Sequence, residues 1–191
     1  GGGVVGVEFA NVFSNAGSKV TIVEMLPNIV ANIDEDIVEC LKAQLIDSGV
    51  EIHVSSKVYK IEKQGDYLKV TVSTPRGIES VIAEKVLVAT GRRPNIEGLG
   101  LERIGVKTER GSIAVDASMR TNLENIYAIG DCTGKVLLAH VASSQGIVAA
   151  ENIMGKSIPI DFRTIPSCVY TNPEIASVGL TEKQALEKGY R

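Results

Sequence analysis

Hydrophobic side chains recur at roughly helical spacing over residues 4–16, which predicts the first helix of the chain. The apolar members of this pattern are Val4, Val5, Phe9, Val12 and Phe13. Ala16-Gly17 supplies an end signal, because glycine adopts the left-handed conformation that closes many helices. The apolar run Val20–Val23 follows and predicts a strand that ends at the acidic Glu24.

A second helix and strand follow in the same order. Residues 34–48 have the pattern of an amphipathic helix with Ile37, Leu41 and Leu45 on one face, and Gly49 ends it. Residues 50–54 alternate between apolar and polar side chains and predict another strand. Helices that alternate with strands are typical of an α/β fold with a parallel sheet.

Three short strands separated by polar turns come next. They are predicted at Val58–Glu62, Tyr67–Ser73 and Ile78–Ile82, and they would form a small antiparallel meander. Lys85–Gly91 has a nearly continuous apolar core, which predicts a buried parallel strand. Together with the two helices, these patterns predict a three-layer α/β nucleotide-binding domain over residues 1–94.

The glycines at the start of the chain form the pattern G-x-G-x-x-G. Gly1 permits a tight turn off a strand, Gly3 has no side chain to block a pyrophosphate, and Gly6 lets the helix pack closely on the sheet. The N–H groups and the positive dipole end of that helix favour a bound phosphate. The strand that leads into such glycines is expected before residue 1. Taken alone, the pattern also fits an ordinary βαβ turn without a ligand.

Glu24 narrows the choice of ligand. An acid at the end of the strand that follows such a helix accepts hydrogen bonds from the hydroxyls of an adenosine ribose. A 2′-phosphate would meet like charge at this position. The glycines, the helix, the strand and the acid therefore predict binding of NAD rather than NADP.

A second acid ends the segment Thr121–Asp131, in which a polar turn precedes an apolar run that predicts a buried strand. Ligands of open α/β sheets bind beyond the carboxyl ends of strands, so Asp131 is placed to bond a hydroxyl-bearing cofactor. A helix is predicted from Leu137 to about Met154, and its first N–H groups favour negative charge nearby. The alternative is that Asp131 only caps this helix.

Composition excludes several classes of protein. The 191 residues carry a formal net charge of −3, 44% hydrophobic residues and no tryptophan, as expected of a soluble protein. Charges of both signs are mixed, so no basic patch predicts binding of nucleic acid, and no apolar run is long enough to span a membrane. Cys40, Cys132 and Cys168 are far apart and lack C-x-x-C or metal-ligand spacing, which predicts neither a disulfide framework nor a metal site.

In their order, these motifs resemble those of the flavin- and NAD-dependent pyridine nucleotide-disulfide oxidoreductases, most of all the members that oxidise dihydrolipoamide. The segments that carry the resemblance are Gly1–Glu8, Glu24, Ala89–Asn95, Thr121–Asp131, Leu137–His140 and Pro166–Glu174. They extend over almost the whole chain, so the ordered set is more specific than any single motif.

The resemblance implies two cofactors, NAD and FAD. For NAD it implies contacts from Gly1, Gly2, Gly3, Val4, Val5, Gly6, Val7, Glu8, Glu24, Val58 and Gly91. For FAD it implies a bond from the ribityl chain to Asp131 and a helix start beneath the flavin at Leu137, Leu138, Ala139 and His140. Residues 95–157 would then be the carboxyl-terminal part of an FAD-binding domain. Residues 158–191 would open an α+β interface domain that pairs with a second subunit.

Two parts of the family's chemistry are not found in this sequence. A redox-active cysteine pair and the first FAD-binding glycine motif would precede it, and a histidine paired with a glutamate, which acts from the partner subunit, would follow it. His53 fits an ordinary strand residue, and His140 is expected to contribute its backbone more than its ring. No residue of the chain is therefore predicted to be catalytic.

Three interpretations of function stay open at this point. The first is a parent enzyme that passes electrons from dihydrolipoamide on a lipoyl-bearing partner protein, through the cysteine pair and FAD, to NAD. The second keeps the fold but changes the substrate to another disulfide, a peroxide or mercuric ion. The third is a nucleotide-binding fragment that is inactive alone and retains no FAD. The expected assembly is a homodimer in the cytoplasm, with the mitochondrial matrix as the alternative location.

Overall fold

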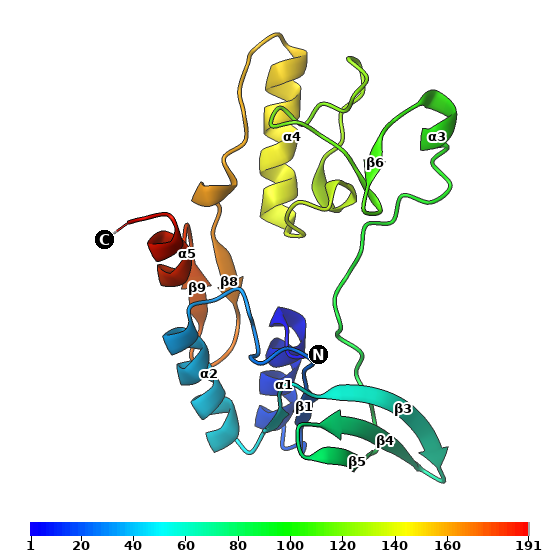
Figure 1. The fold of residues 1–191 in the computed structure, drawn as a ribbon, viewed down its shortest axis with the longest axis vertical. Coiled ribbons are helices and arrows are strands. Elements are labelled where there is room, and N and C mark those ends of the chain that lie inside the picture. The colour runs from blue at the N-terminus through cyan, green and yellow to red at the C-terminus, as the bar shows by residue number, and fades with distance from the viewer. Residues whose placement is uncertain (191) are drawn as a thin grey trace. The chain divides into compact units, whose positions relative to one another are not determined.

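The computed structural model describes residues 1–190, and the chain forms two compact units. Residues 1–91, together with the segment from Pro166 onward, form the first unit, and residues 92–165 form the second. Figure 1 shows the order of helices and strands within each unit. The α/β fold class predicted from the sequence is confirmed. The three-part division at residues 94 and 157 stays a prediction.

The first unit begins with two helices and two parallel strands. Helix α1 is Val4–Asn15, strand β1 is Thr21–Val23, helix α2 is Glu35–Asp47 and strand β2 is Glu51–His53. The two strands pair in parallel along their whole length. All four elements confirm the order that the hydrophobic pattern predicted.

Both helices bury one face in a shared hydrophobic core. The buried side chains of this core are Val7, Ala10, Ile22, Ile29, Val30, Val38, Leu41, Leu45, Val50, Val169 and Ile175. Full burial of one such side chain contributes about 1.5–3 kcal/mol, so the core fixes the glycine-bearing helix α1 on the sheet.

One residue predicted for this core lies outside it. Ile37 is 42% exposed, and Val38 takes its place on the buried face of α2 beside Leu41 and Leu45. The prediction of Ile37 was wrong because a stripe through positions 37, 41 and 45 and one through 38, 41 and 45 both fit a period of 3.6 residues. Only packing against the sheet distinguishes the two.

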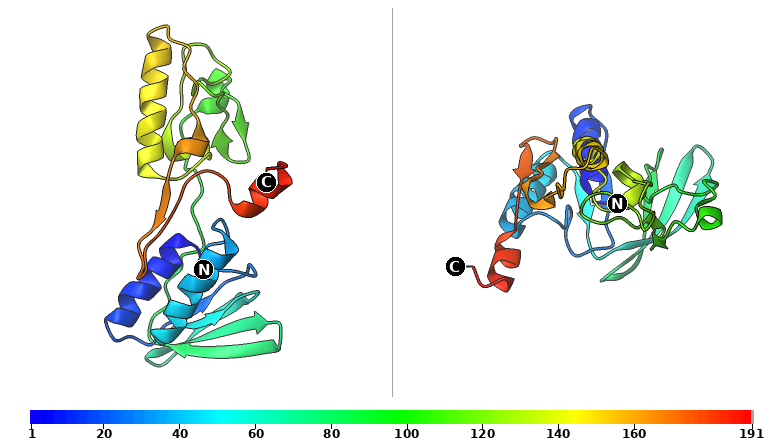
Figure 2. Two further views of the ribbon diagram at one scale, coloured as in Figure 1. Left: turned by 90° about the vertical axis from the view of Figure 1, so that its left-hand side faces the viewer. Right: turned by 90° about the horizontal axis from the view of Figure 1, so that it is seen from above.

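The three predicted short strands form the antiparallel sheet β3–β4–β5, drawn in green and cyan in Figure 2. Strand β3 is Lys57–Gln64, β4 is Tyr67–Thr74 and β5 is Gly77–Ala83. The central strand β4 buries Val70 and Val72. The meander is confirmed, and each strand is slightly longer than its predicted range.

Residues 85–91 do not form the buried parallel strand that their apolar sequence predicts. No strand is assigned over this segment, and the Val86, Leu87 and Val88 side chains are 36%, 52% and 70% exposed. A parallel strand needs a hydrogen-bonded neighbour, and among residues 1–190 strands β1 and β2 pair only with each other. The prediction is wrong because no described strand pairs with this segment.

The last part of the chain belongs to the first unit. Strand β8, Ser167–Val169, pairs antiparallel with β9, Ile175–Ser177, and helix α5, Glu182–Glu187, follows. Val169 and Ile175 enter the same core as α1 and α2. This hairpin is therefore held by the nucleotide-binding unit through its apolar side chains.

The second unit contains one long helix and several short elements. Helix α4 is Ala139–Ile153, which confirms the helix predicted from Leu137 with a start two residues later. The short elements are α3 (Leu101–Ile104), β6 (Thr108–Glu109), β7 (Ser112–Ile113) and the 3-10 helices η1 (Gly130–Thr133) and η2 (Phe162–Thr164). Val106, Ile113 and Ala128 form a small core of their own.

The apolar run that ends at Asp131 forms no strand. Its pairing with described residues is a single bridge between Arg120 and Tyr127, and the 3-10 helix η1 takes over at Gly130. Ala128 is buried, but Ile129 is 43% exposed. The predicted buried strand is wrong because a single bridge is not the continuous ladder of hydrogen bonds that defines a strand.

Candidate nucleotide-binding site

The loop before α1 is held by two hydrogen bonds of Gly2, one from its backbone N–H and one to its carbonyl. The Gly2 N–H donates to Oε2 of Glu24 over 2.6 Å, and the Gly2 carbonyl accepts from the N–H of Val30 over 2.8 Å. The second oxygen of the Glu24 carboxylate accepts from the N–H of Leu26 over 2.7 Å. The predicted ribose-binding acid thus contacts the predicted phosphate loop directly.

Val30 reaches this loop in an unusual backbone conformation. Its φ is +39°, a region that β-branched residues rarely adopt, and its side chain is buried. Such strain persists only where the surroundings fix it, and it is common beside ligand sites. Here the conformation directs the Val30 N–H to the carbonyl of Gly2.

The glycines of the motif differ in what surrounds them. A β-carbon on Gly6 would overlap the carbonyl oxygen of Gly1, and one on Gly1 would overlap the carbonyl oxygen of Ala89. A β-carbon on Gly3 would meet no atom within 4 Å. Gly1 and Gly6 are therefore needed for backbone packing, whereas Gly3 borders open space that a ligand is able to fill.

The first turn of α1 suits an anion. Gly3 is its N-cap residue, no side chain caps the helix, and the first turn carries no acidic residue. The Val4 and Val5 side chains at this end are 37% and 49% exposed. The N-terminal N–H groups and the positive end of the helix dipole are thus available to a pyrophosphate, and the residues present fit NAD.

The remaining residues predicted to contact NAD differ in their exposure to solvent. The Val7 side chain is fully buried in the core, and the Glu8 carboxylate accepts a hydrogen bond from the N–H of Tyr170 over 2.8 Å. Val58 is exposed on β3, and Gly91 is exposed with a φ of +107°. Glycine is required at position 91 by this φ. The contact of these residues with NAD stays a prediction.

The residues predicted to contact FAD lie together in the second unit. The Asp131 carboxylate forms an ion pair with Arg92, with 3.0 Å between Oδ2 and Nη1. The same guanidinium donates through Nη2 to the carbonyl of Leu137 over 2.5 Å. Asp131 does not cap the following helix, because the N-cap residue of α4 is Leu138 and no side chain caps it.

The start of α4 presents backbone to its surroundings. Ala139 and His140 are exposed, while Leu137 and Leu138 are half-buried. An uncapped helix start attracts negative charge, and a half-exposed carboxylate beside it is able to accept a hydroxyl hydrogen bond. The residues present therefore fit the ribityl chain and ring of FAD on this side.

The sequence did not predict the role of two residues in this arrangement. Arg92 lies inside a segment that carries the family resemblance but was not predicted to pair with Asp131. Gln145, on α4, is completely buried and accepts the Gly130 N–H through Oε1 over 2.5 Å. Hydrophobic periodicity does not reveal polar pairs so far apart in a single sequence.

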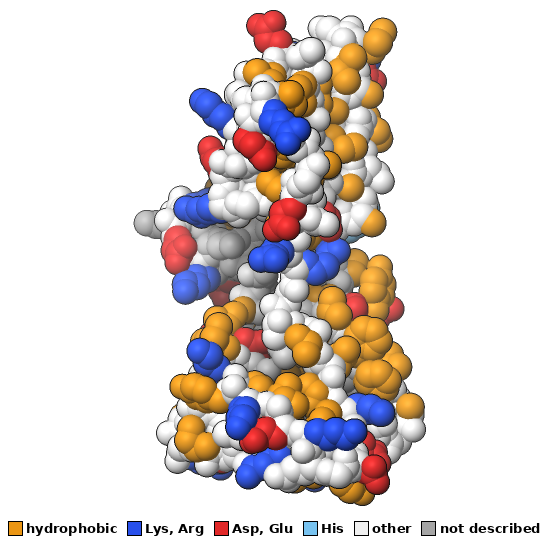
Figure 3. Space-filling model, turned by 90° about the vertical axis from the view of Figure 1, so that its right-hand side faces the viewer, with side chains coloured by type: hydrophobic (Ala, Val, Ile, Leu, Met, Phe, Trp, Pro, Cys, Tyr) orange, Lys and Arg blue, Asp and Glu red, His pale blue; other side chains and the backbone are white. Residues whose placement is uncertain are grey.

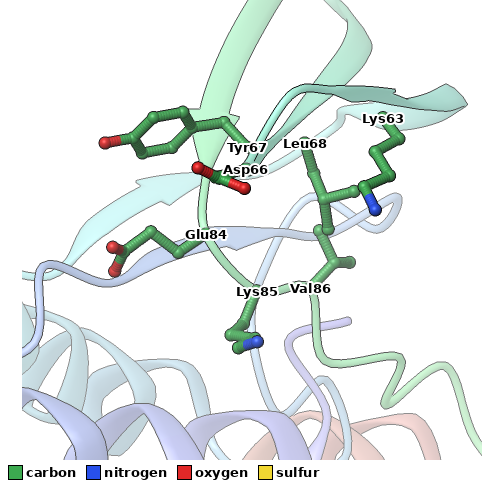
Figure 4. A pocket seen from close by; sticks show the side chains of 7 residues that line it. All are labelled: Lys63, Asp66, Tyr67, Leu68, Glu84, Lys85 and Val86. Carbon is green, nitrogen blue, oxygen red and sulfur yellow. The ribbon is translucent and has the colours of Figure 1, made fainter.

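Two surface hollows accompany these residues, one in each unit. The hollow in the first unit, of about 400 Å³, is lined by Lys63, Asp66, Tyr67, Leu68, Glu84, Lys85 and Val86. Figure 4 shows that these side chains spread in different directions, with Glu84 and Tyr67 on one side and Lys63 on the other. They do not converge on a common point, so the hollow has no arrangement for catalysis or metal binding.

The hollow in the second unit is larger and positively charged. It measures about 1000 Å³, and its basic residues are Arg92, Arg93, Arg110, Arg120 and Lys135. Its acidic residues are Glu109 and Asp116. This excess of positive charge favours an anionic ligand.

Other kinds of site have little support in the part of the chain that the structure describes. No group of three or more His, Cys, Asp or Glu residues within residues 1–190 is arranged to hold a metal ion. Cys40, Cys132 and Cys168 are free thiols, and burial raises the pKa of the Cys132 thiol. A raised pKa lowers the thiolate fraction and hence reactivity.

Basic and acidic side chains are interspersed on the face drawn in Figure 3. Over residues 1–190, every helix is too short or too polar to cross a bilayer.

Comparison with known proteins decides the family. Residues 1–146 match the family model described as pyridine nucleotide-disulphide oxidoreductase, and residues 165–191 match the dimerisation domain of the same family. The chain belongs to this family. The resemblance seen in the ordered motifs is thereby confirmed.

Curated relatives within the pyridine nucleotide-disulphide oxidoreductases are named dihydrolipoyl dehydrogenase. Those of Thermus scotoductus and Chlamydia muridarum are each 45% identical to this chain, over 100% and 99% of its length. The matches cover 42% and 40% of these two relatives. The chain thus spans about 40% of the length of the curated relatives that it matches.

Solved structures of the family have the same fold. LpdA from Mycobacterium tuberculosis has a TM-score of 0.89 at 34% identity, over 97% of this chain and 40% of that chain. The HOCl-induced flavoprotein disulfide reductase RclA from Escherichia coli has a TM-score of 0.88 at 33% identity, over 99% of this chain and 43% of that chain.

Proposed function

We propose that this chain is the NAD-binding part, with adjoining FAD-binding and interface segments, of a dihydrolipoyl dehydrogenase. The whole enzyme would pass electrons from protein-bound dihydrolipoamide, through a cysteine pair and FAD, to NAD. The relatives named dihydrolipoyl dehydrogenase, at 45% identity along the whole chain, support this substrate. The site observation that carries the proposal is the hydrogen bond between Gly2 and Glu24.

The chain contributes binding and orientation to this reaction. The N–H groups at the start of α1 hold the NAD pyrophosphate, and the open space at Gly3 lets it approach the backbone. Glu24 accepts hydrogen bonds from the adenosine ribose. Because its carboxylate is already fixed by Gly2 and Leu26, its orientation costs little side-chain entropy on binding.

On the flavin side, Asp131 accepts a hydroxyl of the ribityl chain, and the segment Leu137–His140 lies under the ring. The uncapped start of α4 favours negative charge near it. FAD and NAD, when bound, supply the hydride and electron chemistry, while the protein sets their position and electrostatics. We assign no catalytic residue to this chain, whose three cysteines are free thiols that lie far apart in the sequence.

The proposed assembly is a homodimer in the cytoplasm with a lipoyl-bearing protein as its partner. The match of residues 165–191 to a dimerisation domain supports pairing of two subunits. The hairpin β8–β9 opens that region, and its packing in the core of the first unit supports a fixed link between the NAD-binding helix α1 and the interface.

The test compares coenzymes on the full-length enzyme. We expect NADH to bind at least tenfold more tightly than NADPH in a fluorescence titration, because the 2′-phosphate would face the Glu24 carboxylate; tenfold is about 1.4 kcal/mol. Reduction of NAD by dihydrolipoamide supplies the substrate test. Tighter binding of NADPH would contradict the proposal.

A second candidate is a disulfide reductase like RclA, whose fold is equally similar to that of this chain. It would use the same nucleotide site but would reduce a different disulfide. The enzyme would then turn over dihydrolipoamide poorly while oxidising NADH with another disulfide. Measuring both reactions at equal enzyme concentration separates the two candidates.

A further inference from the structure

One arginine bonds two separate parts of the proposed flavin site. The Arg92 guanidinium donates through Nη1 to Oδ2 of Asp131 and through Nη2 to the carbonyl of Leu137. Asp131 lies in η1, and Leu137 precedes the N-cap residue of α4. The planar fork of an arginine presents its donors in fixed relative directions, so one side chain sets the carboxylate and the helix start together.

The backbone at this corner is held from the other side by Gln145. Its Oε1 accepts the Gly130 N–H, and its side chain is completely buried. Gly130 has a φ of +75°, and a β-carbon there would lie 3.3 Å from the β-carbon of Ala142. The peptide before Asp131 is therefore fixed by α4, and the rotation of the Asp131 side chain is left to Arg92.

Asp131 needs such a partner because its own side chain is not enclosed. The side chains of Arg92 and Asp131 are 61% and 45% exposed. A half-exposed carboxylate populates several rotamers, and fixing it on ligand binding costs free energy. An ion pair that fixes it beforehand removes part of this cost while leaving Oδ1 available to a hydroxyl donor.

We propose that Arg92 is a positioning residue for FAD, which acts through Asp131 and the start of α4. The inference rests on the proposed function, because it takes Asp131 as the acceptor of the ribityl chain. It goes beyond that function because it gives Arg92 the role of preorganising the site before FAD binds. Arg92 directly follows Gly91, the last residue of the first unit before the chain enters the second.

The experiment measures the FAD dissociation constant of the full-length apoenzyme by fluorescence titration. Arg92→Met is expected to raise it roughly three- to tenfold, a modest effect because the ion pair is partly exposed to solvent. Arg92→Lys keeps the charge but has no planar fork, so an intermediate increase is expected. Arg103→Met is the control and should leave the constant unchanged, since Arg103 is an exposed arginine of the same unit, lies in α3 outside the positively charged hollow and donates no side-chain hydrogen bond to residues 1–190.

The mode of action is tested by combining the variant with Asp131→Asn. If Arg92 acts mainly through the Asp131 carboxylate, Arg92→Met is expected to change the constant by only about twofold in the Asp131→Asn enzyme. The thermal midpoint of the Arg92→Met apoenzyme should match that of Arg103→Met within about 2 °C. If Arg92→Met does not fold, Arg92→Lys is combined with Asp131→Asn in the same comparison.

The outcomes separate this inference from the proposed function. Unchanged FAD affinity in Arg92→Met and Arg92→Lys, with reduced affinity in Asp131→Asn, overturns the role of Arg92 alone. An equal fold-change in the presence and absence of the Asp131 carboxylate also overturns it. Wild-type affinity in Asp131→Asn removes Asp131 from the flavin site, and then the proposed FAD site and the inference fail together.

Discussion

The backbone N–H of Gly2 donates a 2.6 Å hydrogen bond to the carboxylate of Glu24. These residues belong to two different motifs, the glycine loop proposed to bind phosphate and the acid at the end of β1. Because Gly2 is buried, its N–H needs this acceptor, and because the carboxylate is fixed, its charge has a defined position. In the proposed site, coenzyme selection and the shape of the glycine loop would therefore depend on the same bond.

The first prediction concerns coenzyme choice at Glu24. Glu24→Gln keeps an oxygen that accepts from Gly2 but removes the negative charge. We expect NADH affinity to fall about five- to tenfold, which is about 1–1.4 kcal/mol, and NADPH affinity to rise because repulsion of the 2′-phosphate is lost. Isothermal titration of the full-length enzyme with both coenzymes measures the change.

Glu84→Gln is the control for Glu24→Gln, because Glu84 is an exposed acid of the same unit that lies outside the glycine loop. Its coenzyme affinities should equal those of the unaltered enzyme. If Glu24→Gln discriminates between NADH and NADPH as strongly as the unaltered enzyme does, Glu24 does not select the coenzyme.

The second prediction contrasts two glycines of the same motif. Gly6→Ala places a methyl group on the Gly1 carbonyl, and we expect the free energy of unfolding to fall by about 2 kcal/mol or more. Gly3→Ala meets open space, and its φ of −71° suits alanine. We expect the free energy of unfolding of this variant to change by less than about 1 kcal/mol, because the loss of unfolded-chain entropy favours alanine whereas the N-cap position favours glycine.

Coenzyme binding by Gly3→Ala should fall although its stability is nearly unchanged. The added methyl group occupies the space that the pyrophosphate would enter, so NADH affinity should fall by about tenfold or more. Chemical denaturation and NADH titration of the same preparation give the two values. Full NADH affinity in a stable Gly3→Ala enzyme would place the pyrophosphate elsewhere.

The third prediction concerns the bond between Glu8 of α1 and the N–H of Tyr170 after β8. Glu8→Ala removes the acceptor, and we expect hydrogen exchange at the Tyr170 amide to speed up about tenfold, or about 1.4 kcal/mol. Glu8→Gln retains an acceptor oxygen and should show a smaller effect. Exchange is followed by mass spectrometry on peptides that cover the β8–β9 hairpin.

Glu174→Ala is the matched control for this experiment, because Glu174 is an exposed acid in the same hairpin whose carboxylate has no hydrogen bond with residues 1–190. It should leave the exchange of Tyr170 unchanged. Equal exchange rates at Tyr170 in Glu8→Ala and the unaltered enzyme would show that the bond does not hold the hairpin.

The fourth prediction concerns the ionisation of Asp161. Hydrogen bonds from the Arg163 side chain and backbone lower the pKa of this carboxyl from 3.8 to about 2. A folded-state pKa below the unfolded value means that the pair stabilises the folded chain above pH 3.8, and that this contribution is lost as pH falls towards 2. We expect Asp161 to remain mostly ionised at about pH 3.

Arg163→Met should bring the Asp161 pKa back towards its ordinary value, because the side-chain donor and its charge are removed. Carbon-detected NMR of the Asp161 carboxyl between about pH 1 and pH 6 records both titrations. A carboxyl that is already half protonated near pH 3.8 in the unaltered protein would contradict the pairing with Arg163.

Local patterns determined much of the first unit. Helical spacing predicted α1 and α2, and alternation predicted the meander β3–β4–β5, because each of these elements completes most of its hydrogen bonds locally. The glycine motif and Glu24 were also recognised from spacing, and the structure brings them into direct contact. The NAD contacts of Val58 and Gly91 stay predictions.

The failed predictions share one cause. Residues 85–91 and the run before Asp131 have apolar sequences typical of buried strands, yet neither forms one among the described residues. A strand exists only through hydrogen bonds to its neighbours, which are distant in sequence. The choice of Val38 over Ile37 in α2 has a similar origin, since the partner surface selects the buried face.

The sequence by itself determined the α/β class, the order of the early elements and the family, and it predicted the coenzyme preference that we propose for Glu24. Tertiary structure decided which polar groups meet: Gly2 with Glu24, Glu8 with Tyr170, and Arg92 with both Asp131 and Leu137. The physical reason is that periodicity records whether a side chain faces the core or the solvent. A hydrogen bond or an ion pair depends instead on distances of about 3 Å between residues far apart in the chain, which only the folded backbone sets.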